Sequence, residues 1–424
     1  MLNPCAGGIE KHLYLRSRRQ GVSGTEIIRH ELQRPSVFRD EAKLSIDYVP
    51  PNLPHREEHL RKLTQLFRGV IEAPGRFSQK VLIVGDTGSG KTSVTKLFGK
   101  LLTEIAKSHG FNLVYVHVNA RRERTEYMIL NKILAALQTG VPLRGLSTQE
   151  LLSIVLEFIE THNLYLLITL DELGVFLKRR GEELLYLLSR TVDDQLNAQQ
   201  RISLIGISRN PLFGYILDPS TWSTLQKNMI QFNRYNPLQL RDILNFRIKA
   251  AVLDGAVPPS TIDLIADIAG ASGDARYALE LLYNAGKVAD EKGVLRILPE
   301  YVRSAKAFIT PEIRREVLMD LSFHQKLLLL AVCRLLKPSE DAYVTTGALE
   351  ARYGLVSEEY NQTPRSHTQV WAYIQELVGL GILTSKISGI GQRGKTTLIG
   401  LPDIPAAVLE NELELQIEKR KVGG

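Results

Sequence analysis

The sequence has few cysteines and no long hydrophobic run. Cys5 and Cys333 are its two cysteines, too few for a disulfide framework or a cysteine-based zinc site. The longest apolar runs, such as Leu327–Val332, are far shorter than the roughly 18–20 residues of a membrane span. The N-terminus also lacks the layout of a secretion signal. We therefore expect a cytoplasmic protein with no membrane partner.

Extremes of composition and charge are absent as well. The 424 residues are 44% hydrophobic and 23% charged, which is ordinary for a globular chain of about two to four domains. The net charge of +7 permits a nucleic-acid partner but also fits an ordinary solvated surface. Charge alone therefore identifies no function.

A phosphate-binding motif is the most informative feature that is present. Residues 85–92 read GDTGSGKT, which matches G-x-x-x-x-G-K-[ST] between an apolar strand and a helix. In this motif backbone N–H groups surround the phosphates, the lysine reaches the β- and γ-phosphates, and the hydroxyl binds Mg²⁺. The sequence therefore predicts a nucleoside triphosphate site with Lys91 catalytic, Thr92 a metal ligand, and phosphate contacts from Gly88, Ser89, Gly90, Lys91, Thr92 and Ser93.

Strands and helices alternate after this loop, which predicts an α/β fold with a parallel sheet covered by helices. A buried strand over 165–170 ends in Asp171 and Glu172, at the sheet edge where ligands bind. Asp171 is expected to hold Mg²⁺ and Glu172 to polarise the attacking water. The alternative is that the pair only favours the start of a helix. A further strand over 202–207 brings Arg209 and Asn210 toward the γ-phosphate.

The segment from Asn236 onward reads as purely helical, with helices expected over 238–251, 260–269 and 274–290, which fits a small lid over the nucleotide. Arg276 lies in the first turn of the last helix. It would reach the phosphates only with the lid shut, unless it is an ordinary surface cation.

Residues 311–424 predict a winged helix. Helices are expected over 324–335, 346–353 and 366–380, then strands over 381–383 and 396–401 around a glycine-rich tip. Within 361–400 there are four basic residues and one acid, Glu376. A DNA-binding face is therefore expected, unless the module contacts protein. The residues expected on it are Arg365, Ser366, Thr368, Gln369 and Tyr373 in the recognition helix and Arg393 and Lys395 in the wing.

The chain is expected to divide into four parts. A flexible basic arm covers residues 1–43, a nucleotide-binding base 44–234, a helical lid 235–310 and the winged helix 311–424. The arm is either a DNA-backbone contact or a frayed terminus. The base begins with an extended, proline-rich collar over 44–58.

These motifs, in this order, resemble the archaeal replication initiators related to the origin recognition complex and its cell-division-cycle loader, which are AAA+ ATPases. The resemblance begins near Phe38 and covers nearly all of the remaining chain. It rests on the collar 47–57, the loop 85–92, Asn119, Arg121, Thr125 and Tyr127, and the stretches 141–145, 170–172, 184–186, 205–208, 235–237 and 273–279.

The resemblance implies a nucleoid-associated initiator that binds ATP or ADP with Mg²⁺, binds double-stranded origin DNA and helps recruit the replicative helicase, with other initiator paralogues as candidate partners. By position, Tyr48, Val49, Tyr235 and Arg247 would line the nucleoside, and Arg276 would be the second sensor. An insertion near 121–127 would add a DNA-backbone contact through Arg121, Arg122 and Arg124.

Three departures from the family pattern bear on ATP hydrolysis. Arg209 and then Asn210 follow Ser208, where the family has a sensor asparagine directly. Asp218-Pro219-Ser220 replaces Asp-Pro-Arg, whose arginine acts on a neighbouring subunit's ATP. Gly174 lies where the family has an acidic residue. We expect a weak ATPase that acts mainly as a nucleotide-dependent switch.

Two other functions stay open at this point. One is a nucleotide-gated transcription regulator or initiator paralogue that binds DNA without loading helicase. The other is an oligomeric signalling ATPase whose winged helix contacts protein, although the collar, the lid and the basic wing argue against it.

Overall fold

The structure is a computed structural model that describes most of the chain. The described residues are 23–140, 145–178, 183–185, 188, 199–210, 217, 219–309, 315–387 and 396–422. They fall into two compact units. One comprises Asp40–Ala251 and Ile262–Leu282, and the other comprises the residues up to Arg39, Val252–Thr261 and Tyr283 onward.

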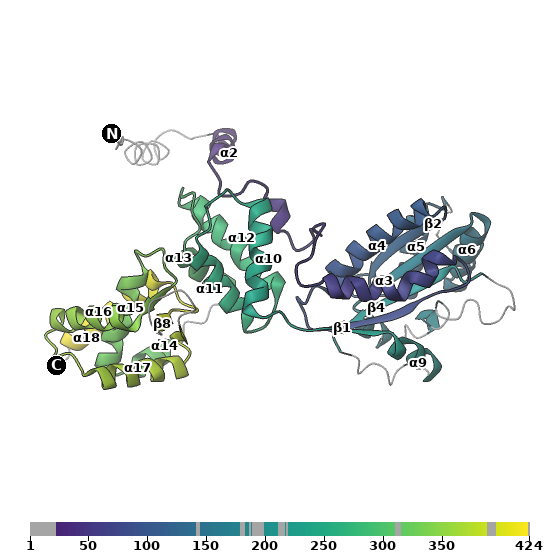
Figure 1. The fold of residues 1–424 in the computed structure, drawn as a ribbon. Helices are drawn as coiled ribbons and strands as arrows, with labels where there is room; N and C mark the ends of the chain where they lie inside the picture. Colours follow the sequence, from purple (N-terminus) through teal and green to yellow (C-terminus); the bar gives the residue numbers. More distant parts are fainter. Residues whose placement is uncertain are drawn as a thin grey trace. The chain divides into compact units, whose positions relative to one another are not determined.

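The first unit contains a parallel sheet of five strands in the order β2-β3-β4-β1-β5. Figure 1 labels β1, β2 and β4 of this sheet. Its strands are β1 (Lys80–Gly85), β2 (Asn112–Asn119), β3 (Leu164–Asp171), β4 (Ile202–Ser208) and β5 (Met229–Phe232). Every adjacent pair is parallel. The predicted α/β sheet is confirmed, and β5 is a strand that the sequence analysis missed. Because all strands run the same way, β1, β3 and β4 bring their carboxyl ends to one edge.

Both faces of this sheet are buried, because alternate residues of each strand point to opposite sides. In β1, Val81 and Ile83 pack in the core that contains residues of α3 and α4, whereas Leu82 and Val84 pack with α5 and α6. The helices of the base are η1 (Glu41–Leu44), α3 (Glu57–Glu72), α4 (Lys91–Ser108), α5 (Glu126–Leu137), α6 (Thr148–Thr161), α7 (Leu173–Leu177) and α9 (Pro219–Lys227).

Four helices follow the sheet, in agreement with the helical pattern after Asn236. They are α10 (Pro237–Ala251), α11 (Pro259–Gly270), α12 (Ala275–Glu291) and α13 (Pro299–Ile309). Near the C-terminal end of α12, Asp290 accepts hydrogen bonds from the Ser36 hydroxyl (2.6 Å) and the Val37 N–H (2.8 Å). The buried Val37 thereby joins the segment that precedes the base to this helix.

The C-terminal part is a small helical domain with a three-stranded antiparallel sheet in the order β6-β8-β7. Its elements are α14 (Arg315–Asp320), α15 (Phe323–Leu336), β6 (Tyr343–Thr345), α16 (Thr346–Glu359), α17 (His367–Gly379), β7 (Thr384–Ile387), β8 (Thr397–Gly400) and α18 (Ala406–Val422). One hydrophobic core contains residues of α14 to α18. This is the helix and hairpin arrangement expected of a winged helix.

One predicted strand of this domain is wrong. Residues 381–383 were expected to be extended, but Gly381 has φ +73° and the strand begins only at Thr384. The N–H groups of Ile382 and Leu383 both bond to the carbonyl of Leu377, at 3.0 and 3.2 Å. Because their N–H groups complete the end of α17, these residues make a helix cap and not a strand.

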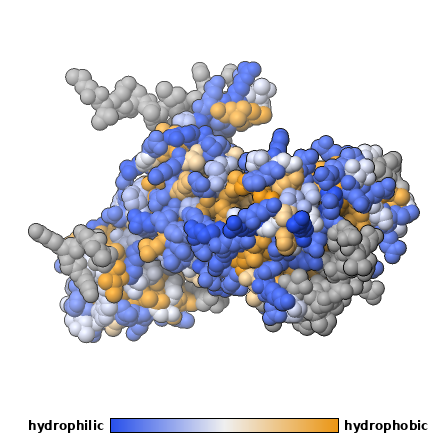
Figure 2. All heavy atoms as spheres, turned by 45° about the vertical axis from the view of Figure 1, so that its right-hand side comes forward, coloured by the Kyte–Doolittle hydropathy of each residue, from blue (hydrophilic) through white to orange (hydrophobic). Residues whose placement is uncertain are grey.

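Near the N-terminus, part of the predicted arm is helical. Helix α2 (Gly24–Gln33) has no buried residue, and its Ile27, Ile28 and Leu32 are exposed. Figure 2 shows apolar surface on this helix. Of the arginines in the predicted arm, Arg29, Arg34 and Arg39 are described, whereas Arg16, Arg18 and Arg19 lie outside the described residues. Among the helices of the described part, none is long and apolar enough to cross a membrane.

Candidate functional site

The phosphate loop connects β1 to α4 in a conformation that requires glycine. Gly88 and Gly90 have φ of +70° and +85°, the left-handed region that residues with a Cβ rarely adopt. Lys91, which is only 8% exposed, donates hydrogen bonds from Nζ to the carbonyls of Gly85 and Asp86, both at 2.7 Å. Burial lowers the pKa of Lys91, whereas the charge of Asp171 raises it. The loop thus holds an ammonium group beneath its own backbone.

Thr92 and Asp171 meet at the edge of the sheet. The Thr92 hydroxyl donates to Asp171 Oδ2 at 2.7 Å, and His117 Nε2 lies 3.5 Å from the same oxygen. Burial opposes ionisation of Asp171, but the hydrogen bonds from His117 and Thr92 outweigh it and keep its pKa below the ordinary value. The hydroxyl and carboxylate supply oxygen atoms, the donors that Mg²⁺ prefers.

Glu172 lies next to this pair and contacts Arg209. Arg209 follows β4, and its guanidinium donates to Glu172 Oε1 at 3.1 Å. The carbonyl of Asn210 accepts a hydrogen bond from the Ser208 hydroxyl at 3.0 Å. Of the two sensor candidates, Arg209 is therefore placed against a predicted catalytic side chain.

Helix α12 begins directly over the phosphate loop. The N–H of Ala275 donates to the carbonyl of Gly88 at 3.3 Å. Asp274 caps the helix, because its carboxylate accepts the N–H groups of Arg276 (2.8 Å) and Tyr277 (3.2 Å). That carboxylate occupies the space where a Cβ on Gly88 would lie, so glycine at this position also permits the close approach of α12.

A hollow opens between the collar, the loop, α10 and α12. Its lining residues are Ile46, Tyr48, Pro50, Leu53, Pro54, Gly88, Gly90, Ser93, Tyr235, Ile243, Phe246, Arg247, Ala275, Arg276 and Leu279. Most of the predicted nucleoside residues are among them, but Val49 is not. The sequence analysis did not single out Ile243, Phe246 or Leu279. Their spacing could have indicated them, because Phe246 follows Ile243 by three residues and Leu279 follows Arg276 by three.

Arg247 supports the collar side of this hollow. Its guanidinium donates to the carbonyls of Ser45 (2.8 Å) and Tyr48 (3.3 Å) and lies 5.0 Å from the centre of the Tyr48 ring. Burial lowers the pKa of Arg247. The arginine thus fixes the aromatic ring that was predicted to line the nucleoside.

Arg56 is a structural residue that the sequence analysis quoted only as part of the collar. It is 4% exposed, and its guanidinium donates to the carbonyls of Ser89 (2.9 Å), His55 (2.9 Å) and Asn233 (2.8 Å). It also lies 3.8 Å from the centre of the Tyr235 ring. One buried cation therefore joins the collar, the phosphate loop and the segment before α10.

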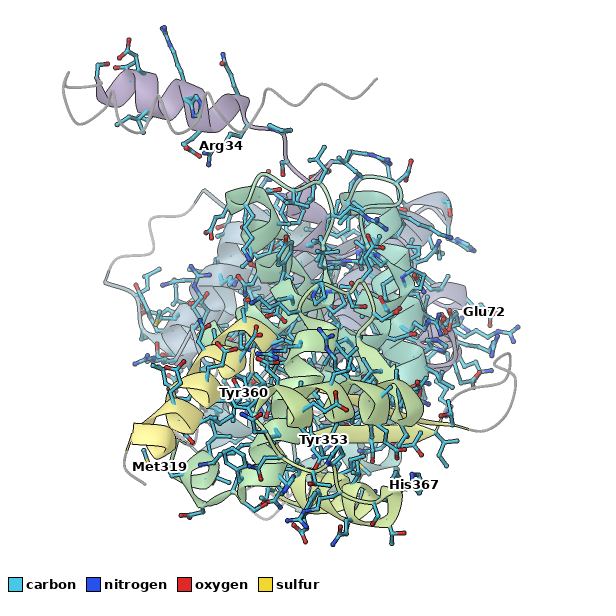
Figure 3. The ribbon with its side chains drawn as sticks, turned by 90° about the vertical axis from the view of Figure 1, so that its left-hand side faces the viewer. Arg34, Glu72, Met319, Tyr353, Tyr360 and His367 are labelled. Carbon is cyan, nitrogen blue, oxygen red and sulfur yellow. The ribbon has the colours of Figure 1, made fainter. Side chains whose placement is uncertain are left out.

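Helix α17 presents the predicted recognition surface. Arg365, Ser366, Thr368 and Gln369 are exposed, whereas Tyr373 is half-buried and packs on the winged-helix core. The start of the helix is anchored because the N–H of Arg365 donates to the hydroxyl of the buried Tyr353 at 3.4 Å. Figure 3 labels Tyr353 and His367, the first residue of α17.

Trp371 is a surface aromatic on α17 that the sequence analysis missed. It is 37% exposed and follows Thr368 by three residues, so the two share a helix face. Trp371 directly follows the buried Val370 in sequence, so its exposure became clear only from the packing of α17.

The other predicted DNA contacts are partly described. Arg121, Arg122 and Arg124 are exposed in the turn after β2. The side chain of Asn119 accepts the N–H groups of Arg121 (3.0 Å) and Arg122 (3.3 Å), which shapes this turn. Arg393 and Lys395 of the wing lie outside the described residues.

Comparison with known proteins gives matches along almost the whole chain. Family models match for an AAA domain over residues 78–212, a Cdc6 AAA+ ATPase-type lid domain over 241–307, and a CDC6 C-terminal winged helix domain over 316–411. The ORC1-type DNA replication protein 2 of Sulfurisphaera tokodaii is 39% identical over 404 residues, which cover 93% of this chain and 96% of that protein.

Two solved structures are also similar. Cdc6p of Pyrobaculum aerophilum is 32% identical with a TM-score of 0.77, and the match covers 91% of this chain and 100% of that one. The Aeropyrum pernix ORC1 protein, solved in complex with DNA, is 33% identical with a TM-score of 0.59, and the match covers 90% and 98%. This chain therefore belongs to the archaeal ORC1/Cdc6 family of DNA replication initiators, AAA+ ATPases with a C-terminal winged helix.

Proposed function

We propose that this chain is an ATP-dependent initiator that binds double-stranded origin DNA and helps recruit the replicative helicase. One observation carries the nucleotide part of the proposal: Gly88 of the loop and Arg276 of α12 line the same hollow. A nucleotide bound there would contact the loop and α12 at once. Its γ-phosphate would therefore favour one placement of α12 over another.

Different residues of the site would contact different parts of the nucleotide. Lys91 and the backbone of residues 88–93 would bind the phosphates, with Arg276 reaching them from α12. Tyr48, Tyr235 and Arg247 would enclose the nucleoside. Thr92 and Asp171 would hold Mg²⁺, which neutralises phosphate charge during hydrolysis. Val49 stays a predicted contact through its place in the collar.

DNA binding is assigned to α17 and to the turn after β2. Thr368 and Gln369 are exposed on α17, and Arg365 and Ser366 are exposed just before its first residue, as entry of the start of a helix into a major groove requires. Arg121, Arg122 and Arg124 would contact the backbone, which is where most protein–DNA hydrogen bonds are made. The Aeropyrum pernix relative was solved with DNA, which supports the same partner here.

Hydrolysis is proposed to be slow. Ser220 stands in place of the arginine that would act on a neighbouring subunit's ATP, a group that contributes roughly 10³–10⁵-fold in other NTPases. In a Ser220→Arg variant, the rate of ATP hydrolysis per protein molecule should rise with protein concentration, because the new cation acts between subunits. A rate that is independent of protein concentration would contradict this reading.

Footprinting on intergenic genomic DNA, with ATP and with ADP, tests the function directly. Protection confined to a replication origin, together with origin-dependent loading of the replicative helicase, is the expected result. Protection scattered over promoters without helicase loading would instead indicate a nucleotide-gated regulator. Lys91→Ala is the matched variant, because it should remove the nucleotide dependence and leave α17 intact.

A further inference from the structure

The backbone at Glu172 is unusual. Glu172 has φ +60° and ψ +37°, a left-handed conformation that is uncommon for residues other than glycine and is concentrated at functional sites. The carboxylate is kept partly out of solvent, at 23% exposure. The fold therefore fixes this side chain in one direction.

The direction is toward Arg209. Strands β3 and β4 are neighbours in the sheet, so the residues that follow them emerge side by side at its carboxyl edge. Arg209 NH2 lies 3.1 Å from Glu172 Oε1. The arginine is about half exposed, at 51%, so the ion pair is accessible to solvent.

The pair also lies within electrostatic reach of Lys91. Burial lowers the pKa of Lys91 most; Asp171 and Glu172 raise it, and Arg276 and Arg209 lower it. The phosphate end of the site thus contains three cations and two carboxylates. Arg209 is the cation that neutralises Glu172.

We propose that Arg209 is a positioning residue that holds Glu172 in an ion pair, so that the site retains ATP and hydrolyses it slowly. This proposal rests on the proposed nucleotide function of the same site. In hydrolysis, the oxygen of a water attacks the γ-phosphorus and the bond from that phosphorus to the β–γ bridging oxygen breaks. The water gives up a proton to the base, and ADP and phosphate leave.

Glu172 is the side chain expected to take that proton. Its Oε1 accepts a hydrogen bond from Arg209 NH2 at 3.1 Å, so this oxygen is committed to the guanidinium and not to a water. Neutralising Glu172 has a second effect, because it removes repulsion between this carboxylate and a γ-phosphate that ADP lacks.

Two independent measurements follow from this charge balance. In Arg209→Gln, single-turnover hydrolysis at saturating ATP should rise about 10-fold, which is less than the roughly 10²–10⁴-fold that a general base contributes in full. Calorimetry measures the affinities for a non-hydrolysable ATP analogue and for ADP. The ratio of these two affinities should fall about 10-fold in the same variant. Arg209→Lys keeps the charge and should preserve that ratio.

The dependence on Glu172 is tested by a double-mutant cycle. Glu172→Gln should abolish hydrolysis and strengthen the preference for the ATP analogue, and adding Arg209→Gln should restore the preference without restoring hydrolysis. Arg201→Gln is the matched control, because Arg201 lies before the other end of β4 and bonds Asn163. It should change neither quantity.

Unchanged or slower hydrolysis in Arg209→Gln would overturn the proposal, and so would a faster rate that persists in the Glu172→Gln background. ADP affinity and the melting temperature report whether each variant is folded. If the unaltered chain bound neither nucleotide, the proposed function itself would fail, which is a different result from normal binding with no effect of Arg209.

Discussion

The phosphate-loop site and the α17 surface are built in opposite ways. Lys91, Arg56 and Arg247 are buried cations, each hydrogen-bonded to backbone carbonyls. The polar side chains of the α17 surface, such as Gln369 on the helix and Arg365 just before it, are exposed. A buried charge is costly unless its partners are fixed, whereas an exposed charge costs little. The proposed nucleotide site is therefore preorganised, whereas the proposed DNA surface consists of exposed side chains.

If burial decides the difference, a buried charge next to the winged helix should behave like those of the nucleotide site. Arg303 of α13 is fully buried, and it donates to the carbonyls of Leu401 (3.0 Å) and Ala342 (2.9 Å) and to Glu300 (3.2 Å). Arg303→Ala should cost about 3–5 kcal/mol, because it leaves Glu300 without its cation. Denaturant unfolding measures this.

The control for Arg303 is an exposed pair of the same unit. Arg296 and Glu340 are both about half exposed, so Arg296→Ala should cost no more than about 1 kcal/mol. Equal costs for the two variants would break the comparison between buried and exposed charges.

The next largest effect is expected at Lys91. Lys91→Ala should weaken ATP binding by about 10- to 100-fold, since a hydrogen bond to a charged group contributes roughly 1.5–3 kcal/mol. Calorimetry with ATP measures it, and binding of DNA fragments should be retained when no nucleotide is added. Unaltered ATP affinity would remove the loop from the proposed site.

Arg56 separates the contribution of charge from that of geometry. Arg56→Lys keeps the cation but loses the planar fork that reaches three carbonyls and stacks on Tyr235. We expect a loss of roughly 1–3 kcal/mol in unfolding free energy, the cost of leaving buried acceptors unpaired. Thermal unfolding with and without ADP measures it. A melting temperature equal to that of the unaltered chain would show that charge alone suffices.

The smallest single effects are expected at the α17 surface, which includes Arg365 just before the helix. Arg365→Ala should reduce the slope of log affinity against log salt by about one, if the side chain meets a phosphate. Arg68→Ala is the control, because Arg68 is an exposed cation of α3 that pairs with Glu72. A slope unchanged from that of the unaltered chain would take Arg365 out of the interface.

Trp371 gives a direct optical test of the same surface. The chain has two tryptophans, so a Trp222→Phe background isolates the emission of Trp371. Addition of duplex DNA should quench or shift that emission, since the ring would leave water on docking. Constant emission at saturating DNA would place the contact elsewhere.

The difference between the two regions also decides what the sequence could predict. The phosphate loop is contiguous, and its glycines, lysine and threonine have fixed roles, so eight letters were enough to predict it. Arg56 contacts Ser89 and Asn233, which are 33 and 177 residues away. Nothing local in the sequence indicates those partners, so its role required the fold.

The prediction for the exposed α17 region was incomplete for a different reason. Polar residues on α17 could be predicted as a group, but their individual directions depend on how the helix packs. Tyr373 was expected to face DNA, and it packs partly on the core while Trp371 takes an outer position. The expected strand over 381–383 was wrong because the last carbonyls of a helix need N–H donors. Residues whose N–H groups bond to those carbonyls cannot also use them to pair with a strand.

Gly88 is held to its small size from two directions. A nucleotide phosphate requires the loop backbone to be bare, and the Asp274 carboxylate fills the space where a methyl group would begin. An alanine there would push back the first turn of α12 and Arg276 with it, even if the phosphates still fitted. The absence of a side chain at Gly88 therefore determines how closely α12 can approach a nucleotide bound to the phosphate loop.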